Sequence, residues 1–146
     1  MSYAADIITA IKTVAAGVAG APALVEARKE NTLHPREAND AVIVTVERER
    51  LIGRAFGGTV IKEYQIIVGV YHQLSPPGDI TSGLNANPQY VLDCKQALDV
   101  AALSGVSAVW DVTLVDNDEW EKQFFKTGME VSYFGLLVQT SEPQNG

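Results

Sequence analysis

Two long segments in which apolar and polar residues alternate stand on either side of the short sequence GRAFGG, residues 53 to 58. The first segment, AVIVTVERE, places Val42, Val44 and Val46 on one side of an extended chain, and the second, TVIKEYQIIVGVYH, repeats the pattern. The three glycines of GRAFGG permit the positive φ angles of a loop between two strands. The sequence therefore predicts a long antiparallel β-hairpin over about residues 42 to 72.

Apolar residues recur at one-turn spacing both before and after this hairpin. The spacing predicts a helix over residues 4 to 18 and a second helix over residues 88 to about 103, with Asn87 as its cap and Pro88 at its first position. The second helix is expected to bury one side, made of Val91, Leu92, Cys94, Leu98, Ala101 and Ala102.

Two further strands are predicted towards the C-terminus. SAVWDVTLV, residues 107 to 115, alternates with Trp110, Val112 and Leu114 on one face, and GMEVSYFGLLVQT is a closing strand. Between the regular elements, residues 75 to 87 are rich in Pro, Gly, Ser and Asn and predict a long loop. Residues 21 to 40 lack sustained periodicity and are expected to be mostly loop, with a helical turn around Leu24 to Arg28.

The resulting order is helix, strand, strand, helix, strand, strand. Hairpin pairs of strands with helices packed on one face predict an α+β fold, with a mostly antiparallel four-stranded sheet. A chain of 146 residues fits a single domain. The ends of the chain, residues 1–3 and 141–146, are expected to fray.

Composition and charge exclude several classes of function. The net charge of −7 argues against nucleic acid as the main partner, because phosphate binding needs a cationic surface. Cys94 is the only cysteine, so an internal disulfide is impossible, and we expect its thiol to be buried among apolar residues. The N-terminal stretch has no basic region before its apolar residues, and no segment approaches the roughly 20 apolar residues of a membrane span. Neither secretion nor a membrane partner is expected.

Motifs of catalysis and metal binding are absent from the sequence. GRAFGG lacks the Lys-Ser/Thr ending of a phosphate-binding loop, and His34 and His72 have no partners at metal-ligand spacing. The acidic residues after the predicted strand 107–115 lack the residue pattern of a calcium-binding loop. The role of the acidic segment from Asp111 to Glu121 stays open. We therefore expect no catalytic residue, no cofactor and no metal, and an enzyme would need a constellation that only the fold assembles.

Charge is distributed unevenly along the chain. Residues 1 to 63 hold eight basic and eight acidic side chains, whereas residues 64 to 146 hold three basic and ten acidic ones. All five arginines lie between Arg28 and Arg54. If the two regions occupy different surfaces, copies of the protein would attract one another head to tail; the alternative is that the charges simply solvate separate faces.

The outer half of the hairpin carries the most unusual pattern. The face of Val42, Val44 and Val46 continues as Arg48 and Arg50, which indicates a strand that has run past its own core. Such an arm, with exposed backbone edges, is suited to adding onto the sheet of a partner. The expected interaction residues are Arg48, Arg50, Arg54 and, as an apolar anchor, Phe56. The alternative is a long solvated hairpin whose charges discourage aggregation.

The layout of the chain resembles the tail-terminator and neck (head–tail joining) proteins of tailed phages. The resemblance covers about residues 5 to 140 and is carried by the order of the elements. These include the strands AVIVTVERERLI and EYQIIVGVYHQ, the helix YVLDCKQALDVAAL, the strand VWDVTLVDN and a closing strand after Phe124 or Phe125.

This resemblance implies a structural protein of the virion with no catalysis and no cofactor. Family members of this kind form a six-fold ring that caps the tail tube and joins it to the head-side connector, after assembly in the host cytoplasm. The hairpin would then meet neighbouring subunits or the tube. A small α+β ligand-binding protein or enzyme, or a host interaction module, is the alternative to this interpretation.

Overall fold

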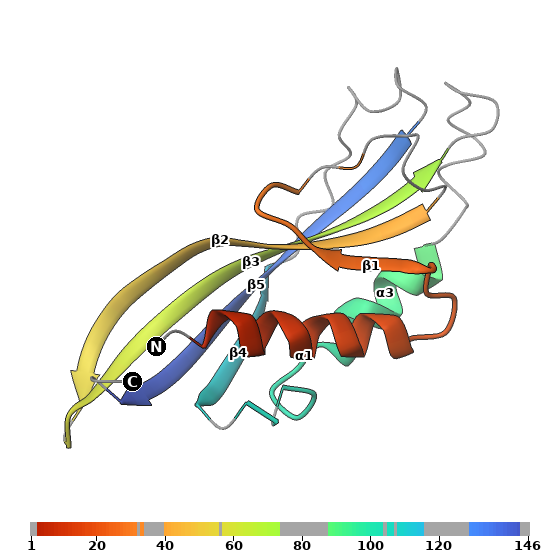
Figure 1. Cartoon of the computed structure of the whole chain (residues 1–146). Helices are drawn as coiled ribbons and strands as arrows, with labels where there is room; N and C mark the ends of the chain where they lie inside the picture. The colour runs from red at the N-terminus through yellow and green to blue at the C-terminus, as the bar shows by residue number, and fades with distance from the viewer. Residues whose placement is uncertain are drawn as a thin grey trace.

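The computed structural model describes residues 3–31, 33, 40–55, 57–73, 88–103, 105–106, 108–115 and 129–143. In this part of the chain, five strands form a single curved sheet, and two helices pack against it (Figure 1). The elements are α1 (Ala4–Gly17), β1 (Leu24–Ala27), β2 (Asp40–Ala55), β3 (Thr59–Gln73), α3 (Pro88–Ala97), β4 (Val109–Val115) and β5 (Met129–Pro143).

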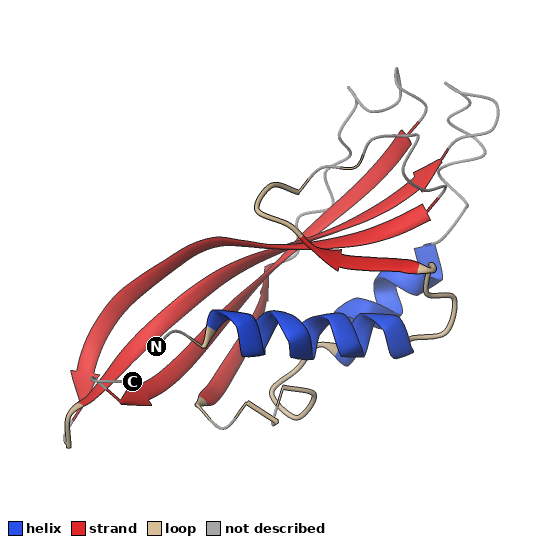
Figure 2. Cartoon of the chain, viewed as in Figure 1, coloured by secondary structure: helices blue, strands red, loops and turns tan. Residues whose placement is uncertain are grey.

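The sheet has the strand order β1-β2-β3-β5-β4. β1 runs parallel to β2, and the other neighbouring pairs are antiparallel. The helices α1 and α3 lie on the same side of the sheet (Figure 2). The α+β class is therefore confirmed. The sheet is mostly antiparallel, as predicted, but it has five strands instead of four because β1 joins β2 in the parallel direction.

The long hairpin formed by β2 and β3 extends from the pair Asp40–His72 to the pair Ala55–Thr59. Gly57 and Gly58 at its turn have φ angles of 81° and 75°. Only glycine adopts such angles at little cost, so the end of GRAFGG is a turn between strands, as the sequence predicted.

The short strand β1 replaces the helical turn predicted around Leu24 to Arg28. Its residues pair with β2 from Leu24 opposite Ala41 to Ala27 opposite Val44. The prediction was wrong because four residues are too few to show a periodicity. What decides the conformation is the open edge of β2, which supplies hydrogen-bond partners to the returning chain.

The main core lies between the helices and the sheet. α1 contributes Ile7, Ile11 and Ala15, each fully buried, and α3 contributes Tyr90 and Cys94. The hydroxyl of Tyr90 donates to the carbonyl of Ala15 at 2.8 Å, which ties the two helices together. Burial of Cys94, predicted from the sequence, is confirmed, and burial raises the pKa of its thiol. The sheet side of this core consists of Val42, Val44, Tyr64, Ile66, Val68, Phe134, Leu136 and Val138.

Helix α3 ends at Ala97, earlier than predicted, and a turn follows in which the carboxylate of Asp99 accepts from the backbone N–H of Ala102 at 2.8 Å. Leu92 and Ala101 were expected in the core, but Leu92 is 47% exposed and Ala101 is exposed as well. The buried stripe instead follows the four-residue spacing of Tyr90, Cys94 and Leu98, which turns Leu92 to the outside.

The face of the sheet away from the helices carries a smaller cluster that the loop after β1 covers. The side-chain amide of Asn31 donates to the carbonyls of Ile43 at 2.8 Å and Ile67 at 3.2 Å. The hydroxyl of Tyr71 donates to the Asn31 carbonyl at 2.6 Å. Gly69 lies directly beneath, where a Cβ atom would overlap the Asn31 side chain and come within 2.9 Å of the Tyr71 ring. The hydrogen bonds of Asn31 thus hold this loop on the sheet, at a place where residue 69 must be glycine.

The two ends of the described chain are more ordered than the sequence predicted. Tyr3 packs against the main core. At the other end β5 continues to Pro143, which lies opposite Thr59, so residues 141–143, where fraying was predicted, belong to a strand. The cause is the length of β3, which offers partners along its whole edge. The predicted loop over residues 75–87 lies outside the described residues.

Candidate functional site: the distal arm

The outer ends of β2, β3 and β5 continue past the N-terminal end of α1 as a curved, three-stranded extension (Figure 1). We call residues 47–55, 59–65 and 137–143 the distal arm. The sequence predicted an arm of two strands at this place. The third strand, β5, pairs with β3 as far as its end and so gives the arm a continuous backbone ladder.

A β-bulge at the base of the distal arm decides where its charges lie. The pairing shifts between Val46, opposite Ile66, and Arg48, opposite Gln65, so Glu47 is an extra residue. A bulge of one residue exchanges the two faces of the strand beyond it. Arg48 therefore lies on the face away from the helices. The prediction that the arginines continue the face of Val46 is wrong for this reason.

A second shift, between Leu51 and Gly53, exchanges the faces once more. Arg54 lies opposite Val60 and thus on the helix side of the sheet, whereas Arg50, opposite Glu63, shares the reverse face with Arg48. The predicted interaction residues therefore divide between two faces. Phe56, the predicted apolar anchor, lies outside the described residues.

Arg50 is held in place by an ion pair across the hairpin. Its Nη2 atom lies 2.8 Å from Oε1 of Glu63, while 52% of the arginine side chain stays exposed. Such an exposed pair contributes at most about 1 kcal/mol to stability. A guanidinium group carries five N–H donors in a fixed fork. Arg50 is thus held at the surface, and with half of its side chain exposed it keeps further donors accessible to a partner.

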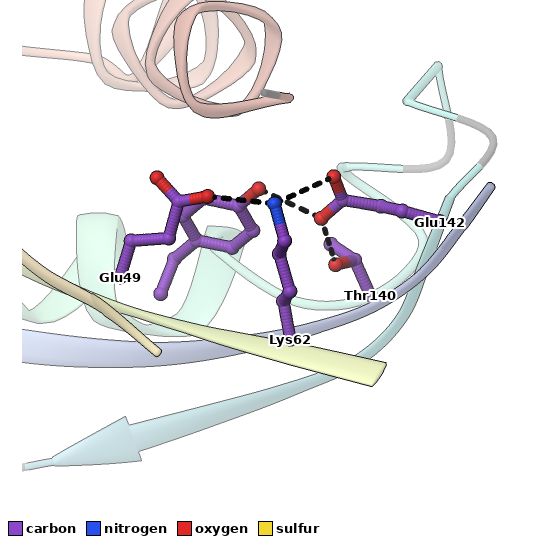
Figure 3. A network of polar contacts seen from close by, with 5 residues as sticks. Glu49, Lys62, Thr140 and Glu142 are labelled. Carbon is purple, nitrogen blue, oxygen red and sulfur yellow. Dashed lines mark hydrogen bonds and ion pairs between the residues drawn. The ribbon is translucent and has the colours of Figure 1, made fainter. Parts of the chain in front are cut away.

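The helix side of the distal arm holds a polar network where an apolar core would be expected (Figure 3). The carboxylate of Glu142, in a residue only 1% exposed, accepts from the hydroxyls of Tyr64 at 2.7 Å and of Thr140. The ammonium group of Lys62 lies 3.7 Å from Glu142 and donates to Glu49 at 2.9 Å. The hydrogen bond to Glu49 is the main cause that raises the pKa of Lys62.

This network joins all three strands of the distal arm, because its members come from β2, β3 and β5. A buried polar group is costly unless it is paired, so the contacts favour one relative position of the strands. Sequence reasoning missed the network. One signal was available in the sequence. Lys62 is a charged residue on the same side of the strand as the buried Tyr64, Ile66 and Val68.

The sheet has two open edges at the level of the distal arm. β1 pairs with β2 only as far as Val44, and within the described chain no strand covers β2 beyond that residue. β4 forms the opposite edge. Large apolar side chains are exposed on both edges: Leu51 and Ile52 on β2, and Trp110, Leu114 and Val115 on β4. Exposed strand edges of this kind are templates for pairing with another chain.

At the other end of the sheet, three ionisable side chains lie in a row across β2, β3 and β5. Nδ1 of His72 lies 2.7 Å from the carboxylate of Asp40, and Glu130 is the strand partner of His72 on its other side. Burial raises the pKa of Glu130 to about 7, against the opposing effect of His72. Among the residues that the structure describes, no three His, Cys, Asp or Glu side chains are grouped to hold a metal ion.

Neither of the two described helices has the length and apolar character needed to cross a membrane. A comparison with known protein families and with curated proteins finds no match for this chain.

Proposed function

We propose that this chain is a structural subunit of a phage virion, a tail terminator or head–tail joining protein that forms a ring at the end of the tail tube. Its partners are further copies of itself, the tail tube protein and the head-side connector. The ring is six-fold, and it forms in the host cytoplasm before it becomes part of the virion.

The distal arm is the observation that carries this proposal. Its outer end projects beyond α1, its strands are joined by the Glu142 network, and its β2 edge exposes apolar and cationic side chains together. A rigid projection with an open edge is suited to contact between subunits rather than to the enclosure of a small ligand. The order of helices and strands supports the same proposal through the resemblance to terminator and neck proteins.

Reversal of charge on the arm tests this role. The double variant Arg48→Glu/Arg50→Glu is expected to melt close to the wild-type temperature, because both side chains are exposed and the ion pair of Arg50 with Glu63 contributes at most about 1 kcal/mol. Its self-association, measured by mass photometry and sedimentation velocity at low salt, is expected to be lost. The matched control Lys12→Glu/Lys95→Glu makes the same change in net charge on the two helices, away from the arm and from the β2 edge, and should assemble normally.

Two results would count against the proposal. Equal loss of assembly in both double variants would mean that net charge, and not the arm, controls association. A chain that stays monomeric at all concentrations, and that mass spectrometry does not find in purified virions of a phage encoding it, would show that it is not a ring subunit of the particle.

A further inference from the structure

We infer that copies of this chain join edge to edge into one continuous antiparallel sheet, in which β2 of one copy, over residues 45–51, pairs with β4 of the next copy. The inference rests on the proposed ring function, because it assigns the contact between neighbouring subunits to two particular strands. Each open edge of the sheet is thus covered by another copy of the same chain.

Strand direction is the first observation that supports this pairing. β2 and β5 run towards the tip of the distal arm, and β3 and β4 run away from it. A second copy in the same orientation places its β4, which runs away from the tip, beside β2, which runs towards it. The alternation of directions then continues across the boundary without a break. The contact uses two different surfaces, and such head-to-tail contacts form rings when the rotation between copies closes.

The register of the sheet places opposite charges next to each other at this boundary. One cross-strand row on the reverse face consists of Arg50, Glu63, Gln139 and Asp111, in that order from the β2 edge to the β4 edge. In a neighbour at the same level, Asp111 would stand directly beside Arg50. Side chains opposite each other on paired strands are roughly 5 Å apart at Cβ. The carboxylate of Asp111 would therefore meet the accessible donors of the Arg50 guanidinium.

Two of the three rows on the helix side bring apolar residues together, and in the row between them Val112 of the neighbour would stand opposite Glu49. Val46 is in the same row as Leu114, through Ile66 and Leu136, so the neighbour's Leu114 would cover Val46. In the same way Leu51 would meet the Val109 of the neighbour, next to the bulged Trp110. Five of the seven exposed large apolar residues in the described chain lie on these two edges, which is what an unformed subunit interface requires.

The two edges also match in length. β1 covers β2 as far as Val44, and the backbone N–H of Arg28 donates to the Val44 carbonyl at 3.0 Å. β4 ends at Val115, whose row continues through Gly135 and Ile67 to Thr45. A neighbouring β4 would therefore begin to pair with β2 at the residue after the last one that β1 covers. The edge left open by β1 has the length that β4 fills.

Exchange of the two charges tests the pairing. Arg50→Asp and Asp111→Arg are each expected to lose ring formation, since each places like charges at the boundary. The double variant Arg50→Asp/Asp111→Arg should regain it. An equimolar mixture of the two single variants should also form rings of alternating copies, because every boundary then joins opposite charges. Mass photometry and sedimentation velocity measure the assemblies, and circular dichroism verifies that each variant is folded.

Hydrogen exchange on the wild-type chain gives a second measurement that depends on no variant. Backbone amides of residues 48–51 and 109–115 should exchange more slowly in the ring than in the monomer. Rings that form without this protection, or variants that neither the double exchange nor the mixture rescues, would overturn the strand pairing and leave the proposed ring function standing. Rescue by a chain that is absent from virions would support the pairing and refute the phage function.

Discussion

Glu142→Ala removes the carboxylate that joins the strands of the distal arm, and its effect on stability follows from the contacts of that carboxylate. Glu142 accepts hydrogen bonds from Tyr64 and Thr140 and lies 3.7 Å from the ammonium group of Lys62. A hydrogen bond with a charged partner contributes about 1.5 kcal/mol at the low end, so the two hydroxyl contacts together contribute about 3 kcal/mol. The one methylene group that the substitution removes adds about 0.8 kcal/mol.

The expected loss in the free energy of unfolding is therefore about 4 kcal/mol, the sum of these contributions. For a chain of about this length, roughly 3 °C of melting temperature corresponds to 1 kcal/mol, so the variant should melt about 12 °C lower. Urea unfolding followed by far-ultraviolet circular dichroism measures the free energy directly, and a thermal melt verifies it.

The control is Glu49→Ala, which removes the other carboxylate that contacts Lys62. Its side chain is 35% exposed, and the loss of an exposed ion pair costs at most about 1 kcal/mol. If Glu142→Ala destabilises the protein no more than this control does, the carboxylate is not buried and paired in solution. Residues 141–143 would then be frayed, as the sequence alone suggested, and the reasoning about a rigid arm would be refuted.

Two further changes test other parts of the sheet. Gly69→Ala should lower the free energy of unfolding by about 2 kcal/mol, because the new methyl group overlaps Asn31. Urea unfolding measures this loss, and Gly135→Ala, whose new methyl group would lie no closer than 3.4 Å to its neighbours, is the matched control. Equal losses in the two variants would contradict the Asn31 contact. Burial raises the pKa of Glu130 from 4.5 to about 7, so the folded state should lose stability as the pH rises between these values. Glu130→Gln removes this loss. The urea midpoint of the variant should exceed that of the wild type by clearly more at about pH 7.5 than at about pH 4. A difference that does not depend on pH would contradict the burial of Glu130.

The hairpin and the main core could be predicted because the information is local. Alternation over a dozen residues and a glycine turn define β2 and β3, and the spacing of Ile7 and Ile11 defines the buried side of α1. β1 could not be predicted in this way, since its four residues become a strand only beside the edge of β2.

The candidate site depends on contacts between distant segments, which one sequence does not reveal. The bulge at Glu47 has no residue signature; it is defined by how β2 fits against β3, and it changes which face carries Arg48 and Arg50. The bond between Tyr64 and Glu142 joins residues that are 78 positions apart. Sequence reasoning therefore identified the charged arm as the notable region and assigned Arg48 and Arg50 to the wrong face.

The position of β5 between β3 and β4 determines the order in which the sheet can be completed during synthesis. β4 leaves the ribosome before β5, its partner in the described sheet, and β3 presents an unpaired edge until β5 is made. Contacts between segments this far apart in the chain form slowly, and open edges in the interval favour association with other chains. The centre of the sheet, the docking of β4 and the arm are therefore complete only after β5 has paired. If copies pair through the β2 and β4 edges as we propose, a nascent chain cannot offer both edges until the interior of the sheet has formed, so pairing between copies waits for folding.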